Sequence, residues 1–362
     1  MYTLEEKICI LFGDKLVSSN KFFQVWNLFE DANDLIANFC KSKEAEKLLA
    51  NNYATIRDGI KKRVYEQIID DMDKYDIYAV TWFSPDYPKQ LRDIDDKPYV
   101  LFCKGNFKLF ATQCLSVVGT RKISSYGRRI TKDFTAILCE YFTIVSGLAY
   151  GVDSVAHETT LEESGATIAV LGGGLLNVYP TANQGLADRI VQSGGLLVSE
   201  YGLRATPMAY NFPQRNRIVS GLSKGLLVCQ APSKSGTNST VELALEQGRD
   251  VFVVPGEIYD LGFKGSNSLI KSIQGACVTT PRDIVDFYGL DKPVAHKESY
   301  QMSIEEQAVV NALSSGQLTF DELVFKTGIV PANLNFLLAN LELRSIIAKL
   351  AGNTYRLYGG IE

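Results

Sequence analysis

Histidine is nearly missing from this chain, since His157 and His296 are the only two among its 362 residues. So few imidazoles exclude most histidine-based acid–base catalysis and most zinc sites. The seven cysteines are scattered and never form a CxxC pair, so we expect reduced, buried thiols and no bound metal. The sequence also lacks the P-loop motif of nucleotide-binding proteins and the HExxH motif of zinc peptidases.

Long apolar segments are missing as well. The longest are short strand-like runs such as Ala166 to Leu171, far below the roughly 18 residues that cross a bilayer. The first residues place acids before a short apolar run, which is not the pattern of a signal peptide. We therefore expect a cytoplasmic protein that makes no membrane contact.

The composition is that of a globular protein. With 46% hydrophobic and 22% charged residues, the chain can bury a substantial core in two or three domains. Its net charge of −4 argues against a protein that coats nucleic acid with its whole surface. Five basic residues nevertheless lie between Arg121 and Lys132 with no acid among them, so any site for a polyanion should be local.

The spacing of apolar residues divides the chain into parts. It predicts a small helical module over residues 1–75, of the SAM or helix-hairpin-helix kind. Residues 76–290 start with two strand-like runs and then alternate strands with helices, which predicts an α/β fold. A linker over 291–302 precedes three helical patterns and two short strands over 303–362, the order of a winged helix. Strands are expected near 115–119, 142–146, 167–171, 195–199, 225–229 and 250–254.

The alternation over residues 76–290 favours an extended Rossmann-like domain, with a doubly wound and mainly parallel sheet covered on both faces. The predicted strands end at glycine or at small polar residues. Because the carboxyl ends of parallel strands meet at one edge, these loops would let backbone N–H groups and helix N-termini face an anion, usually phosphate. The loops carry arginines and no catalytic set, which favours a binder of phosphate-rich polymer over an enzyme.

The loop Gly119-Thr120-Arg121 follows a buried strand and combines backbone donors, a hydroxyl and a guanidinium. We interpret it as a phosphate cradle, although a tight turn with a solvated arginine would have the same sequence. Gly147, Gly173 and Lys264 extend the same strand-end surface.

We interpret the segment from Asn211 to Arg217 as a loop that binds single-stranded nucleic acid. Arg215 and Arg217, on either side of Asn216, would clamp phosphates, while Tyr210 or Phe212 stacks on bases. Alternatively, one of the two arginines is a buried ion-pair partner that holds the following helix.

Two further groups have both a binding and a structural interpretation. Ser235, Gly236 and Thr237 precede a helix expected to begin near Ser239, where their groups would bind an anion or only cap the helix. Asp153 lies one turn before His157 and could orient its imidazole, but such a pair is more often a structural hydrogen bond.

Six segments follow one another within residues 115–277: VGTRKISSYG, SGLAYGVDSVAH, TIAVLGGGL, NFPQRNRIVSGLS, KSGT and GRDVFVVPG. Together they resemble the DNA-processing protein A family (DprA, also called Smf), bacterial proteins of natural transformation. Two departures from the family pattern are Leu176 and Thr181, where members often have Asp and Lys, and Cys229-Gln230-Ala231, where Val-Glu-Ala is usual. The helical N-terminus and the winged helix extend the resemblance over nearly the whole chain.

The resemblance implies a homodimer that binds single-stranded DNA regardless of sequence, protects it and loads the RecA recombinase in natural transformation and homologous recombination. It implies no catalytic residue, cofactor or metal. It places the DNA contacts on Gly119, Thr120, Arg121, Phe212, Arg215, Asn216, Arg217 and Ser235 to Thr237.

Two other functions stay open on the same architecture. A phosphoribohydrolase-like, nucleotide-processing enzyme is loosely suggested by SKSGTNSTVE, but its acid, Glu242, comes five residues after Thr237 instead of three. A nucleotide-sensing adaptor is the other possibility. The expected recognition helix of the winged helix, Pro331 to Leu343, has no Lys or Arg, so we expect it to contact protein instead of DNA.

Overall fold

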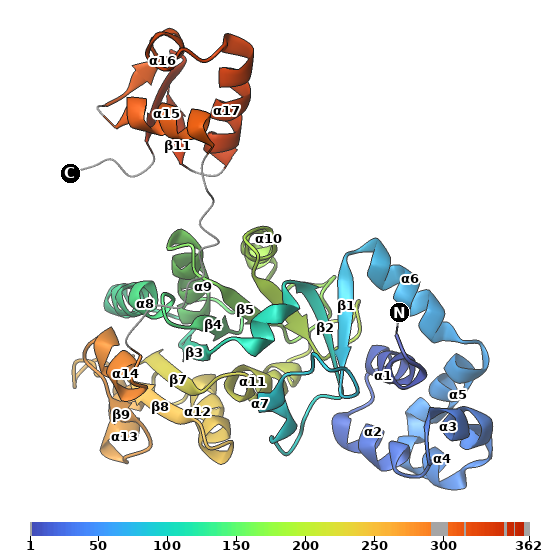
Figure 1. Ribbon diagram of the computed structural model, residues 1–362. Helices are drawn as coiled ribbons and strands as arrows, with labels where there is room; N and C mark the ends of the chain where they lie inside the picture. Colours follow the sequence, from blue (N-terminus) through green and yellow to red (C-terminus); the bar gives the residue numbers. More distant parts are fainter. Residues whose placement is uncertain (1, 291–302, 315, 344–345, 351, 358–362) are drawn as a thin grey trace. The chain divides into compact units, whose positions relative to one another are not determined.

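The computed structural model describes residues 2–290, 303–314, 316–343, 346–350 and 352–357 of the chain (Figure 1). The chain divides into two compact units, and the boundary falls between residues 296 and 297. Each has its own hydrophobic core, and the candidate site belongs to the first unit.

The helices of residues 4–74 pack directly on the sheet that follows them. The Phe22 ring stacks on Tyr99 with centroids 3.9 Å apart, and Tyr99 directly precedes strand β2 (Val100–Gly105). At Gly13 helix α1 approaches the sheet so closely that a Cβ would overlap Val100 and press tightly against Phe102. The helices and one face of the sheet therefore share a single core. These helices are α1 (Leu4–Asp14), α2 (Ser19–Trp26), α3 (Ala32–Asn38), α4 (Lys43–Leu49), α5 (Tyr53–Lys61) and α6 (Val64–Lys74).

Within residues 77–277, nine strands form one sheet in the order β1-β2-β6-β5-β4-β3-β7-β8-β9. The strands from β3 to β9 run parallel to one another, while β2 is antiparallel to both β1 and β6. The chain builds outward from β3 in one direction and then returns to add β7 on its other side, which makes the junction of β3 and β7 a topological switch point. The strands are β1 (Ile77–Thr81), β2 (Val100–Gly105), β3 (Cys114–Gly119), β4 (Thr143–Ser146), β5 (Thr167–Val170), β6 (Leu196–Ser199), β7 (Gly225–Gln230), β8 (Asp250–Val253) and β9 (Ala276–Cys277).

Helices cover both faces of this sheet (Figure 1), as predicted. One face packs against α7, α11, α12 and α13, and the other against α8, α9, α10, α14 and the N-terminal helices. The expected doubly wound α/β fold is thus confirmed, and the strand predictions agree with the observed ends to within one residue. The helices are α7 (Lys89–Arg92), α8 (Ser125–Leu138), α9 (Val152–Glu162), α10 (Gln184–Gln192), α11 (Asn211–Gly221), α12 (Gly236–Glu246), α13 (Lys264–Lys271) and α14 (Pro281–Phe287).

The second unit is a winged helix, as its sequence pattern predicts. Its strands form an antiparallel sheet in the order β10-β12-β11. Leu323, Leu334 and Ile347 lie in its core. The elements are α15 (Ile304–Leu313), β10 (Leu318–Thr319), α16 (Phe320–Thr327), α17 (Pro331–Leu343), β11 (Ile347–Leu350) and β12 (Thr354–Leu357).

The cysteines of the described chain are unpaired, and five of the seven are buried. Burial raises the pKa of Cys229 to about 12, so this thiol stays protonated and packs as a small apolar group. Over the residues that the structure describes, no helix has the length and apolar character needed to span a membrane.

Candidate nucleic-acid interface

A cleft of about 750 Å³ opens at the carboxyl ends of β3, β4 and β7, at the switch point of the sheet. It unites loops that lie far apart in the sequence. Of the residues proposed from the sequence, the cleft is lined by Gly119, Thr120, Arg121, Gly147, Phe212, Arg215, Asn216, Ser235, Gly236 and Thr237. Gly173, Tyr210, Arg217 and Lys264 do not line it.

Two backbone N–H groups of the loop after β3 donate hydrogen bonds to Gln230, a buried residue at the end of β7. The Thr120 N–H donates to the Gln230 carbonyl at 2.8 Å, and the Ser124 N–H donates to the Gln230 side-chain oxygen at 3.0 Å. The uncharged side chain of Gln230 thus fixes this loop through its amide oxygen. Arg121 and Lys122 stay exposed on the loop, where they can reach an anion.

The segment from Asn211 to Arg217 is not a loop, so that prediction was wrong. It forms the first two turns of helix α11. Pro213 is compatible with a helix here because the first residues of a helix have no intrahelical N–H bond to lose. Residues two apart on a helix point in nearly opposite directions, so Arg215 and Arg217 cannot both face the cleft.

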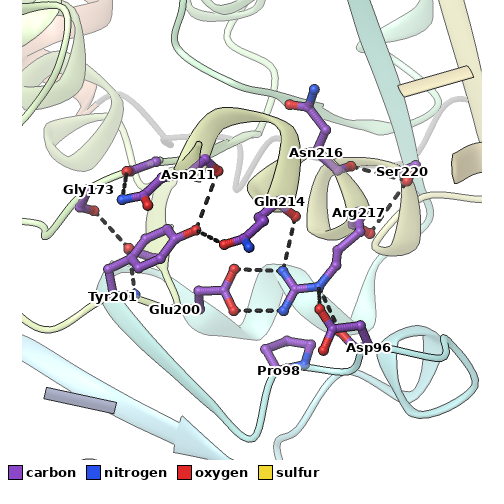
Figure 2. A network of polar contacts seen from close by, with 12 residues as sticks. Asp96, Pro98, Gly173, Glu200, Tyr201, Asn211, Gln214, Asn216, Arg217 and Ser220 are labelled. Carbon is purple, nitrogen blue, oxygen red and sulfur yellow. Dashed lines mark hydrogen bonds and ion pairs between the residues drawn. The ribbon is translucent and has the colours of Figure 1, made fainter. Parts of the chain in front are cut away.

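Arg217 has the ion-pair role that the sequence left open (Figure 2). Its two terminal nitrogens donate to the two carboxylate oxygens of Glu200 at 2.6 and 2.7 Å. Its Nε donates to the Asp96 carbonyl at 2.7 Å. Burial by itself would lower the pKa of Arg217, but Glu200 and Asp96 outweigh it and raise that pKa. The pair ties α11 to the end of β6 and to the segment before β2.

Arg215 lies on the floor of the cleft and is 3% exposed. One terminal nitrogen donates to the Val170 carbonyl, and its Nε has no hydrogen-bond partner among the described residues. The guanidinium lies so close to Gly147 that a Cβ there would overlap it. Burial lowers the pKa of Arg215 to about 10, an effect that nearby Asp153 opposes, so the group remains charged at neutral pH.

Asp153 and His157 do not form the hydrogen bond considered from the sequence. Asp153 accepts from the Gly147 and Ala149 N–H groups at 3.2 and 3.3 Å, and burial raises its pKa against the opposing charge of Arg215. His157 pairs its Nδ1 with the Thr167 hydroxyl at 2.7 Å instead. Burial and the Arg215 charge lower the pKa of His157 to about 3, so the ring is neutral and structural.

Helix α12 begins at Gly236, three residues earlier than expected. The Ser235 hydroxyl caps it by accepting from the Thr237 N–H at 3.1 Å. The capping interpretation of this serine is therefore confirmed. Lys234, just before the cap, is exposed and lines the cleft.

Three segments of the cleft meet where one arginine and two aromatic rings contact one another. The guanidinium carbon of Arg121 lies 5.3 Å from the centre of the Phe212 ring, and the Tyr179 ring lies 5.6 Å from it. The sequence reasoning missed Tyr179 and Lys234 as site residues. The Gly-Gly-Gly strand end before Tyr179 and the basic residue inside SKSGT were the available signals.

The cleft as a whole suits a phosphate-bearing chain with exposed bases. Its exposed cations are Arg121, Lys122 and Lys234, and its buried one is Arg215. Of the described residues that line it, Asp153 alone is acidic, and this carboxylate is occupied by backbone donors. Cations, a helix N-terminus and aromatic rings in one groove are the combination that single-stranded nucleic acid requires.

Arg217→Ala should lower the free energy of unfolding by about 3–5 kcal/mol, because it leaves the largely buried Glu200 carboxylate, 15% exposed, without its partner. Arg204→Ala is the matched control, since Arg204 pairs with Asp71 at the same 2.6 Å but both side chains are about half exposed. That control should lose about 1 kcal/mol or less. Urea denaturation measures both, and equal losses in the two variants would contradict a structural role for the buried pair.

Two family models match this chain, one over the α/β sheet and one over the C-terminal part. The family described as DNA recombination-mediator protein A matches residues 78–289, and the DprA winged helix domain matches residues 295–353. Protein Smf of Escherichia coli (strain K12) is 47% identical over 202 residues, which are 55% of this chain and 54% of that protein. The match therefore covers about half the length of this relative.

Two solved structures share the fold. DNA processing protein A (DprA) from Streptococcus pneumoniae is 32% identical with a TM-score of 0.65, and the match covers 79% of this chain and 98% of that one. DNA processing protein A from Helicobacter pylori, whose structure concerns its single-stranded DNA binding mode, is 30% identical with a TM-score of 0.55 over 60% of this chain and 98% of that one. With a family match over more than half of its residues, the chain belongs to the DNA recombination-mediator protein A family.

Proposed function

We propose that this protein binds single-stranded DNA, whatever its sequence, in the cleft at the strand ends. We propose further that it protects this DNA and loads RecA recombinase onto it in natural transformation and homologous recombination, acting as a homodimer and without catalysis, cofactor or metal. The observation that carries the proposal is the meeting of exposed cations, backbone donors and aromatic rings in one cleft. The relative from Helicobacter pylori, described as binding single-stranded DNA, supports it.

Within the cleft, phosphates would lie against the loop after β3 and the N-terminus of α12. Arg121 and Lys234 are exposed and would reach the backbone of the strand, while the N-terminus of α12, capped by Ser235, would direct the positive end of its helix dipole at a phosphate. Contacts to phosphates carry no sequence information, so affinity would be similar for all sequences and would fall with added salt.

The geometry argues against the phosphoribohydrolase-like alternative. Glu242, the acid on which that activity would depend, is exposed on α12 and does not line the cleft. Asp153 lines the cleft but is buried and hydrogen-bonded to two backbone N–H groups. Release of free base from a nucleoside monophosphate would contradict our proposal.

Arg121→Ala should weaken binding of fluorescent oligo-dT and of mixed-sequence oligonucleotides by a similar factor. Because one phosphate contact is lost, the slope of log K against log[salt] should become shallower by about 0.7. Fluorescence anisotropy at several salt concentrations measures both quantities.

Arg189→Ala is the control, since Arg189 is equally a surface arginine but lies on α10, outside the cleft. It should change neither the affinity nor the slope. An unchanged salt slope in Arg121→Ala would remove this arginine from the DNA site, and no binding by the wild type would refute the proposed function.

RecA loading makes a separate prediction. On single-stranded DNA already coated with a single-strand-binding protein, the wild type should shorten the lag before RecA hydrolyses ATP, and Arg121→Ala should not. A lag that the wild type leaves unchanged would refute loading while leaving DNA binding intact.

The proposed homodimer is tested separately, since analytical ultracentrifugation of the wild type should show the mass of two chains.

We propose that the winged helix contacts protein and not DNA. Phe325, Val330 and Phe336 are 91%, 63% and 69% exposed on or beside α16 and α17, and α17 carries no Lys or Arg. A chain ending after Leu290 should therefore keep its affinity for single-stranded DNA within about twofold, because no phosphate contact is removed. A larger loss, measured by anisotropy, would place DNA contacts in the second unit.

A further inference from the structure

The Phe212 ring, expected to stack on DNA bases, is already surrounded within the cleft. On one side it contacts Gly172 so closely that a Cβ there would lie 2.9 Å from Phe212 Cδ1. The Arg121 guanidinium lies over the ring at 5.3 Å, and the Tyr179 ring packs against it at 5.6 Å with 47° between the two planes. A base could stack on Phe212 only if one of these neighbours moved away.

Tyr179 contacts the same ring but presents much more of its own surface. It is 49% exposed, whereas Phe212 is half-buried, and both line the cleft. Tyr210 is also exposed but does not line the cleft. Of the described aromatic residues that line the cleft, Tyr179 therefore offers the most accessible face.

The chain on both sides of Tyr179 is anchored to neighbouring loops. Before it, the Asn177 amide donates to the Arg204 carbonyl at 2.7 Å. After it, the Asn183 amide donates to the Leu148 carbonyl at 2.8 Å and to the Ser154 hydroxyl at 2.9 Å. A ring held between two fixed points loses little conformational entropy when a base stacks on it.

We propose that Tyr179 supplies the face on which a DNA base stacks, and that Phe212 supports both Tyr179 and Arg121. This inference rests on the proposed binding of single-stranded DNA. It divides the cleft into a base subsite on the loop that carries Tyr179 and a phosphate subsite on the loop that carries Arg121.

The division is tested with two fluorescent strands of equal length, oligo-dT and the same backbone with all bases removed. Tyr179→Ala should weaken the affinity for oligo-dT by about fivefold or more, because fivefold corresponds to the weakest base–aromatic stacks. It should leave the affinity for the abasic strand unchanged. Tyr179→Phe should bind both strands like the wild type, because the ring and not the hydroxyl makes the contact. Unchanged binding of the abasic strand also shows that the Tyr179→Ala variant is folded.

The controls separate Tyr179 from other rings. Tyr78→Ala removes a tyrosine that is 47% exposed on strand β1, away from the cleft, and should have no effect. Phe212→Ala should weaken binding of both strands, because Arg121 loses its support together with Tyr179.

Equal binding of oligo-dT by Tyr179→Ala and the wild type would overturn the inference and leave the proposed function standing. The inference would also be overturned if Tyr179→Ala lost affinity equally for both strands, or if Tyr210→Ala and not Tyr179→Ala lost affinity for oligo-dT alone. If the wild type bound neither strand, the proposed function itself would be wrong and the inference would fall with it.

Discussion

The ion pair between Arg217 and Glu200 determines how helix α11 sits on the sheet, and the cleft depends on that placement. Burying either charge alone would cost several kcal/mol, but the bidentate contact and the Asp96 carbonyl compensate both groups together. Any rotation of α11 about its axis would separate them. The helix is therefore held with Arg217 toward β6 and with Phe212 and Arg215 toward the cleft.

The cleft combines one fixed charge with several exposed ones. Arg215 is held on the floor by the Val170 carbonyl and by the close approach of Gly147, so its charge does not have to be ordered when a ligand arrives. Arg121 and Lys234 at the rim are solvated, and salt screens them strongly. The floor would thus set where an anion lies, while the rim would set how steeply affinity depends on ionic strength.

The N-terminal helices belong to the same framework. The connection from β6 to α11 passes Gly202, where a Cβ would lie 2.7 Å from the Asp14 carbonyl oxygen, and Arg204, which pairs with Asp71 of α6. This connection also carries Pro207 and Ala209 into the cleft wall. The helical residues before the sheet therefore support one wall of the cleft as well as the sheet itself.

The strands, their alternation with helices and the winged helix could all be predicted from the amino-acid sequence, because they follow from local periodicity and from glycine at strand ends. It also placed Arg121 and Phe212 in one site, since both follow parallel strands whose carboxyl ends must meet. Three features emerge only from the packing of the folded chain: α11 is a helix from Asn211, Arg215 faces the cleft while Arg217 faces Glu200, and Tyr179 joins the site. They could not be predicted because burial of a charge or a ring depends on partners distant in sequence: Arg217 bonds to Asp96, 121 residues away, and Phe212 packs on Gly172 and Tyr179 from another strand end.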